Sequence, residues 1–168
     1  LSKEEIEEEL CGAFGLKRIL WLDHGTIIGD DTDSHVDILA RFCSPDTIAY
    51  MQCTDPDDPH YEPLAQMERQ LREFRTIDGK RYNLIPLPLP EPLYLDDYRL
   101  PASYANFLIV NGGVLLPGAG SPMDEIARKR LQEAFPDREV VVIDCRALLS
   151  GHGSLHCITM QFPKGYLR

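Results

Sequence analysis

The sequence predicts a mixed α/β fold in which a helix, a strand, a loop and the start of a β-hairpin follow one another three times. Two observations indicate this: apolar residues at helical spacing mark three segments, and a short apolar run typical of a strand follows each of them. The chain has 168 residues, 43% of them hydrophobic, which is enough for one domain with its own core. We therefore expect a single domain over residues 1–168.

The first repeat opens with the capping-box pattern S-x-x-E and continues with apolar residues on one helical face, so residues 2–14 are predicted to be a helix. The run RILWL at 18–22 predicts a short buried strand. Segments 36–43 and 47–53 flank the turn S-P-D and predict a β-hairpin.

The second repeat begins with a predicted helix at 60–74 and an extended segment at 82–89. Alternating prolines in that segment exclude a helix and favour a strand at the edge or end of a sheet. A second hairpin is predicted for 103–110 and 114–118, because the N-G-G sequence between them is a strong turn signal.

The third repeat predicts a helix at 121–135, with Pro122 near its start, and a strand at 139–145. A glycine-rich loop follows and leads into HCITMQF at 156–162, which predicts another strand. That strand would hold Cys157 at its entrance.

Charge and cysteine content exclude some function classes. The formal net charge is −10, from 27 acidic and 17 basic residues, which argues against nucleic acid and weakly favours a cationic ligand. No apolar run approaches the roughly 20 residues that span a bilayer, and no signal peptide opens the chain, so we expect no membrane association. The five cysteines are odd in number and lack a C-x-x-C motif, which argues against disulfides and structural zinc and favours a reducing cytoplasm.

The loops of the repeat place chemically useful residues at comparable points. They carry His35 with Asp37, then Asn106, and then Cys157. Asp37 and Asn106 are 69 positions apart, as are His35 and Tyr104. Because a pseudo-symmetric repeat gathers equivalent positions around one axis, we predict a cluster of Cys157, His35, Asp37 and Asn106.

The cluster offers the groups that covalent catalysis requires. A strand over H-V-D would place His35 and Asp37 on one side. A cysteine thiolate is a nucleophile and a histidine transfers protons, so Cys157 and His35 form a possible catalytic pair.

A metal site is the competing interpretation, because one loop is crowded with acids and histidines. These are Asp23, His24, Asp30, Asp31, Asp33 and His35. Its two histidines are 11 positions apart, without a recognised ligand spacing, and turn formation is the ordinary role of acids at 30–33. We interpret His152 and His156 as neighbours of the site and not as ligands.

Four stretches together resemble one enzyme family. They are WLDHGTIIGDDTDSHVDILARF, TDPDDPHYE, PASYANFLIVNGGVLLP and GHGSLHCITMQFP, which occur in the family's order over residues 18–163. They are similar to the agmatine deiminase and bacterial-type peptidylarginine deiminase family of guanidine-modifying enzymes. The family's G-D-E-T-D-G-H-V-D reads GDDTDSHVD here, with Asp31 for glutamate and Ser34 for glycine, and its G-G-G-N-I-H-C-I-T reads GHGSLHCIT.

The resemblance implies a partial pentein-type propeller, a ring of about five αββαβ units. Family members are roughly twice as long, so the match implies the C-terminal half of such a deiminase. The other half of the family's pattern carries an aspartate that holds the guanidinium group and an aromatic wall of the pocket. We therefore also expect an exposed apolar edge and self-association.

The resemblance also implies roles for individual residues. Cys157 would attack the guanidinium carbon, His35 would transfer protons and activate water, and Asp37 would bind the guanidinium through paired hydrogen bonds. The remaining candidate substrate-binding residues are Asn106, Asp31, Gly151 and Gly153. No metal or organic cofactor is implied.

The predicted function is hydrolysis of a guanidine group to a ureido group with loss of ammonia. The partner would be a small cationic guanidino compound, with agmatine first and free or peptidyl arginine as alternatives. Two other hypotheses stay open: a folded but catalytically incomplete half-domain, and a thiol hydrolase of the protease type, which would need an oxyanion hole.

Overall fold

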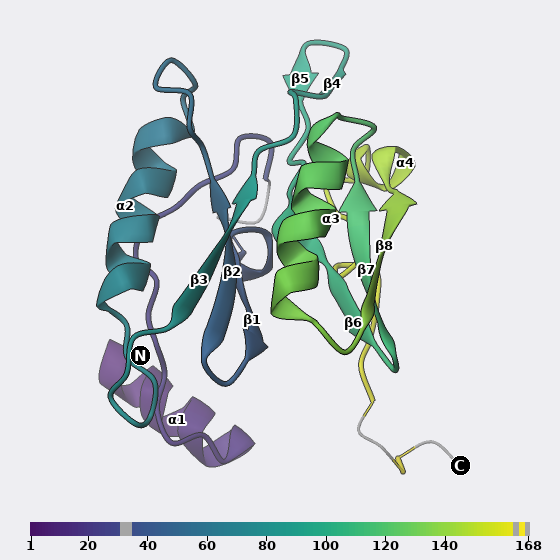
Figure 1. The fold of residues 1–168 in the computed structure, drawn as a ribbon. Helices are drawn as coiled ribbons and strands as arrows, with labels where there is room; N and C mark the ends of the chain where they lie inside the picture. Colours follow the sequence, from purple (N-terminus) through teal and green to yellow (C-terminus); the bar gives the residue numbers. More distant parts are fainter. Residues whose placement is uncertain (31–34, 163–164, 167–168) are drawn as a thin grey trace.

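The computed structural model describes residues 1–30, 35–162 and 165–166. Two ββαβ units lie side by side (Figure 1). In each unit two antiparallel strands form a hairpin, a helix follows, and a third strand returns parallel to the second. This topology explains why strand-like apolar runs alternate in the sequence with segments whose apolar residues recur at helical spacing.

The first unit comprises β1 (Ala40–Ser44), β2 (Thr47–Gln52), α2 (Tyr61–Glu73) and β3 (Asn83–Pro88). Its strand order is β1-β2-β3, with β3 parallel to β2. The extended segment with alternating prolines is therefore an edge strand, as predicted. Proline has no N–H to donate, and an edge strand has one side on which no donor is needed.

The second unit comprises β6 (Leu108–Val110), β7 (Gly113–Gly118), α3 (Met123–Ala134) and β8 (Glu139–Asp144). Its strand order is β6-β7-β8, again with the last strand parallel to the second. Gly112 has a φ of +87° in the hairpin turn, a conformation that favours glycine. Both predicted hairpins and the helices near 60–74 and 121–135 are confirmed.

Six shorter or peripheral elements complete the described chain. They are α1 (Lys3–Phe14), the 3₁₀ turns η1 (Val36–Ile38) and η2 (Tyr104–Asn106), the small hairpin β4 (Tyr94–Leu95) and β5 (Tyr98–Arg99), and α4 (Arg146–Leu149). α4 and the small hairpin were not predicted.

The core lies between the sheets and the two long helices. α2 packs on β2, whereas α3 packs on both β3 and β8 and so joins the two units. Met67 of α2, Leu87 of β3, Leu116 of β7 and Leu131 of α3 are all completely buried. None of the helices in the described part of the chain is long and apolar enough to cross a membrane.

Two predicted strands are wrong. Residues 18–22 have no regular secondary structure and form no strand, and neither do residues 156–162. Both runs are apolar enough for a strand, but a strand exists only where a partner receives its hydrogen bonds. Within the described ranges no segment pairs with either run.

The prediction of a strand over H-V-D is also wrong. Residues 36–38 form a 3₁₀ turn, so alternation along a strand does not place His35 and Asp37 on one side. Residues 104–106 form the corresponding turn before β6. Each hairpin therefore starts later than the apolar pattern indicated.

The N-terminal helix is confirmed, including its capping box. The Ser2 hydroxyl accepts from the Glu5 amide at 3.2 Å, and the Glu5 carboxylate accepts from the Ser2 amide at 2.6 Å. No residue of α1 is buried, and Phe14 on its apolar face is 71% exposed. Because neither 18–22 nor 156–162 is a strand, the predicted order of helix, strand, loop and hairpin is complete only once in the described chain, from α2 to the β6–β7 hairpin, and the unit that occurs twice is ββαβ.

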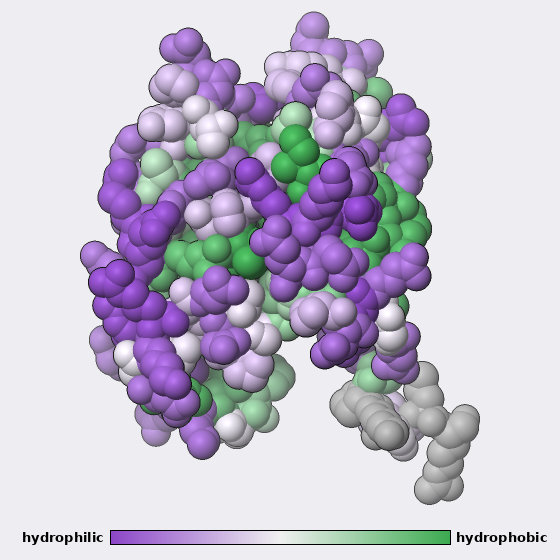
Figure 2. Space-filling view, in the orientation of Figure 1, coloured by the Kyte–Doolittle hydropathy of each residue, from purple (hydrophilic) through white to green (hydrophobic). Residues whose placement is uncertain are grey.

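Apolar side chains are also exposed on the edge strand of the second unit. Val141 and Ile143 of β8 are 38% and 37% exposed. Figure 2 shows apolar surface along the border where β8 lies.

Candidate functional site

Two 3₁₀ turns bring the candidate residues together. η1 carries Asp37 and η2 carries Asn106, and the two turns contact each other. Ser103 joins them, because its hydroxyl donates to the Ile38 carbonyl at 2.6 Å and accepts from the Ala105 amide at 3.1 Å. The turns are thereby fixed at the starts of the two hairpins.

Asn106 is the centre of the site and is completely buried. Its Nδ2 donates to Asp37 Oδ2 at 3.0 Å and lies 3.3 Å from Cys157 Sγ. Its Oδ1 accepts from the His156 amide at 2.9 Å. One amide side chain therefore connects η1, η2 and the segment that carries the cysteine.

The thiol of Cys157 lies next to a carboxylate. Cys157 Sγ is 3.8 Å from Asp37 Oδ2 and 3.5 Å from Asn106 Oδ1, and Cys157 is exposed. The other oxygen of Asp37, Oδ1, is buried and has no hydrogen-bond partner among the described residues. A carboxylate oxygen in this position favours a ligand that supplies N–H donors and a positive charge.

His156 belongs to the site, although we interpreted it from the sequence as a neighbour. Its Nδ1 is 2.7 Å from Asp37 Oδ2, and its side chain is 32% exposed. Because the carboxylate only accepts, Nδ1 carries the proton and donates it. The signal that could have found it is its place in the chain, directly before the cysteine.

The structure does not join His35 to the cluster. His35 is exposed at the start of η1, and no hydrogen bond within the described residues links its imidazole to Cys157 or Asp37. Asp31, the other acidic candidate of this loop, lies outside the described residues.

The glycines of the loop before Cys157 have different surroundings. A Cβ on Gly153 would lie 3.2 Å from Cys157 Cβ, so only glycine leaves this contact relaxed. A Cβ on Gly151 would lie 3.5 Å from the Leu148 carbonyl, an ordinary contact. The close approach to the cysteine is therefore a property of Gly153.

Arg41 places a cation near the carboxylate. Burial lowers the pKa of Arg41, and attraction to Asp37 opposes this shift. The guanidinium donates to the Phe107 carbonyl at 2.7 Å and lies 4.9 Å from the centre of the Phe107 ring. Its charge is thus held in place in the wall of the site.

The acidic loop shows no metal centre in the part that the structure describes. No group of three or more histidine, cysteine, aspartate or glutamate side chains there could hold a metal ion. Asp23 instead accepts from Gln70 Nε2 at 2.7 Å and pairs with Lys3 at 3.6 Å. Asp33, like Asp31, lies outside the described ranges.

This arrangement can bind a planar cation and present a nucleophile to it. A soft sulfur stands at the surface, and the carboxylate beside it is fixed by two donors, Asn106 Nδ2 and His156 Nδ1. Fixed geometry between a nucleophile and a binding group lowers the entropic cost of reaction. The chemistry that the site favours is attack of sulfur on a cationic carbon centre.

Comparison with known proteins identifies relatives over nearly the whole chain. Residues 1–163 match the family model of the Porphyromonas-type peptidyl-arginine deiminase. The agmatine deiminase of Stutzerimonas stutzeri is 35% identical to this chain over 186 residues, which cover 100% of this chain and 50% of that protein.

Solved structures have the same fold. A crystal structure of a Porphyromonas gingivalis protein is 52% identical, with a TM-score of 0.97, and the match covers 100% of this chain and 50% of that one. An agmatine deiminase of C. jejuni is 41% identical, with a TM-score of 0.84 and coverage of 94% and 46%. The chain thus spans about half the length of the relatives it matches.

Proposed function

Because the chain belongs to the Porphyromonas-type peptidyl-arginine deiminase family, we propose that its site takes part in the Cys-dependent hydrolysis of a guanidine group to a ureido group. The observation that carries the proposal is the placement of Cys157 Sγ 3.8 Å from Asp37 Oδ2, with Asn106 bonded to both. A guanidinium bound to the carboxylate would present its carbon to the sulfur.

The reaction would proceed in two halves. The thiolate of Cys157 adds to the guanidinium carbon, and the tetrahedral adduct loses ammonia to leave an amidino-thioether. Water then adds to the same carbon, the C–S bond breaks, and the ureido product leaves as the thiolate returns. The net reaction consumes one water and releases one ammonia, without oxidation or reduction.

Two proton transfers accompany these steps, and we assign both to His35. The departing nitrogen needs a proton, and the attacking water must lose one. His35 is exposed and stands two positions before Asp37, whereas Nδ1 of His156 is already engaged by the carboxylate. In this assignment Asp31 assists substrate binding through its carboxylate.

Agmatine is the substrate we propose first, with N-carbamoylputrescine as product. The names of the S. stutzeri and C. jejuni relatives support it. Free or peptidyl arginine is the alternative, which the name of the matching family favours. The reaction would take place in the reducing cytoplasm, where the five free thiols stay unoxidised.

A second candidate is a folded half-domain that is inactive alone. It is favoured by the coverage of about half of each relative and by the exposure of Cys157. In a water-excluded site, fixed charges and dipoles act more strongly than they do at an open surface. We further propose that the two ββαβ units are part of a pentein-type propeller, which would supply the missing walls.

The deciding experiment is colorimetric detection of ureido product from agmatine, arginine and a peptidyl arginine. The full-length gene product and the 168-residue chain are assayed in parallel, each with its Cys157→Ala variant. Cys157→Ala should abolish turnover without lowering the unfolding midpoint, because this thiol is exposed. An active Cys157→Ala variant would overturn the assignment, and turnover by the 168-residue chain would overturn the inactive half-domain.

A further inference from the structure

One two-residue backbone segment outside the cluster, Ile28–Gly29, is held from both sides. The Ile28 amide donates to His60 Nε2 at 2.9 Å. The carbonyl of the following residue, Gly29, accepts from Tyr98 Oη at 3.1 Å and from His152 Nδ1 at 3.2 Å. These three side chains come from the start of α2, from β5 and from the glycine loop before Cys157.

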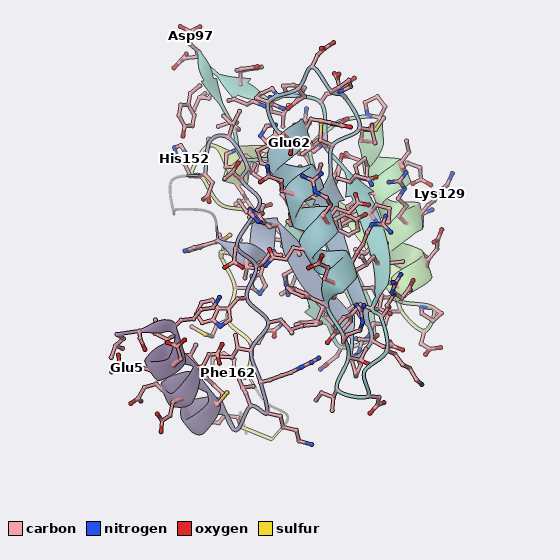
Figure 3. The ribbon with its side chains drawn as sticks, turned by 90° about the vertical axis from the view of Figure 1, so that its left-hand side faces the viewer. Glu5, Glu62, Asp97, Lys129, His152 and Phe162 are labelled. Atoms are coloured by element: carbon pink, nitrogen blue, oxygen red, sulfur yellow. The ribbon has the colours of Figure 1, made fainter. Side chains whose placement is uncertain are left out.

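His152 adopts a backbone conformation that is uncommon for a residue other than glycine. Its φ is +61°, in the left-handed region that favours glycine. The G-G-G-N-I-H-C pattern that the sequence resembles has glycine at this position. The imidazole of His152 also packs edge-on against the Tyr98 ring, with ring centres 5.2 Å apart and an interplanar angle of 72°. Figure 3 shows His152 beneath the β4–β5 hairpin, whose tip carries Asp97.

His60 holds the same two-residue segment from the other side. It is 2% exposed, and its Nδ1 is 2.6 Å from Asp58 Oδ1. Because the Ile28 amide donates to Nε2, the ring is neutral and carries its proton on Nδ1. Arg99 fixes Asp58 through a contact of 3.2 Å to its second oxygen. Every polar atom of this imidazole is therefore engaged.

We propose that His152 is a positioning residue, which with His60 clamps the two-residue segment Ile28–Gly29 and locks the loop leading into Cys157 to the part of the chain that precedes the His35 loop. The clamp joins the segment that carries the nucleophile to the part of the chain that precedes the proton-transfer group. The fit is tight, because a Cβ on Gly29 would lie 2.2 Å from the Arg99 carbonyl. The catalytic consequence rests on the proposed deiminase function, but the clamp itself does not.

The test compares three variants of His152 with one control. His152→Gly removes the imidazole and relieves the backbone, His152→Ala removes only the imidazole, and His152→Asn keeps a side-chain donor in a residue that tolerates positive φ. Asp96→Gly is the control, because exposed Asp96 is the other non-glycine residue with positive φ in the described chain, at +53°.

Two readouts are independent of turnover: the amide exchange rate of Ile28, and the rate at which iodoacetamide alkylates Cys157, followed on its own peptide by mass spectrometry. For His152→Gly and His152→Ala we expect both rates to change at least about fivefold, and kcat of the full-length gene product to fall at least about tenfold with little change in KM. A displacement of about 1 Å can cost about a hundredfold. His152→Asn should keep the exchange rate, the alkylation rate and kcat close to those of the wild-type protein. Asp96→Gly should change none of these three rates.

The outcomes separate the two proposals. If His152→Gly leaves both exchange and alkylation unchanged, or if Asp96→Gly changes them equally, the clamp is wrong. If the wild-type protein releases no ureido product while the His152 variants still alter exchange and alkylation, the deiminase proposal fails and the clamp stands.

Discussion

Replacing Asn106 with alanine should lower the free energy of unfolding by more than the small size of the asparagine side chain indicates. The side chain is completely buried and makes hydrogen bonds to Asp37 and from the His156 amide. A hydrogen bond to a charged group contributes about 1.5 to 3 kcal/mol and a neutral one about 1 kcal/mol. We therefore expect Asn106→Ala to lower the free energy of unfolding by about 3 kcal/mol, because Asp37 loses one of its two donors and the His156 amide loses its acceptor.

Asn83→Ala is the matched control, since Asn83 is exposed at the start of β3 and makes no side-chain hydrogen bond in the described structure. Surface substitutions of this kind change stability by about 0.5 kcal/mol or less. Urea unfolding near neutral pH measures both variants, and a loss of about 3 kcal/mol shifts the midpoint by about 1.5 M at a slope near 2 kcal/mol/M. Equal losses in the two variants would refute the reasoning, because the polar contacts of Asn106 would then contribute nothing.

Three further predictions concern other parts of the molecule. Gly29→Ala should lower the free energy of unfolding by about 1 to 3 kcal/mol more than Gly79→Ala. Both glycines have positive φ, but only Gly29 faces a backbone carbonyl. Equal urea midpoints for the two variants would contradict this. Burial lowers the pKa of His60 below its ordinary 6.5, so the unfolded chain binds a proton more readily; stability should be full above about pH 6.5 and fall as the pH drops toward the folded-state pKa. His60→Gln should flatten that profile in urea unfolding across mildly acidic pH, and an unchanged slope would count against it. The 168-residue chain should self-associate through β8, so light scattering should show a mass that rises with concentration, and Val141→Lys with Ile143→Lys should remove the rise; a wild-type monomer at every concentration would sink this idea.

Local patterns in the sequence predicted the elements whose stability is local or lies within a hairpin. The Ser2–Glu5 capping box, the turn at Gly112 and the prolines of β3 each act over a few residues. The failures concern segments whose structure depends on a distant partner. Residues 18–22 and 156–162 have strand composition but no strand to pair with in the described chain.

In the candidate site too, the sequence predicted what the repeat pattern fixes and missed what depends on distant contacts. The repeat placed Asp37 and Asn106 at equivalent points, and the structure joins them by a hydrogen bond of 3.0 Å. The place of His156 directly before Cys157 was a signal that it belongs to the site, but its contact with Asp37 depends on how the last loop returns to η1. The role of His35 stays a proposal. The sequence pattern assumed a strand over H-V-D, whereas His35 lies at the start of the 3₁₀ turn η1.

The prolines of β3 give the first sheet an edge that cannot recruit another chain. Pro86 and Pro88 lack the N–H groups that strand addition requires, and Pro86 sits opposite Tyr50 in the parallel register. The topologically equivalent strand β8 has no proline between Glu139 and Asp144. Of these two equivalent edges, the β3 edge lacks the donors that pairing with a further strand needs, whereas the β8 edge has them. An additional strand can therefore join this pair of edges only at β8.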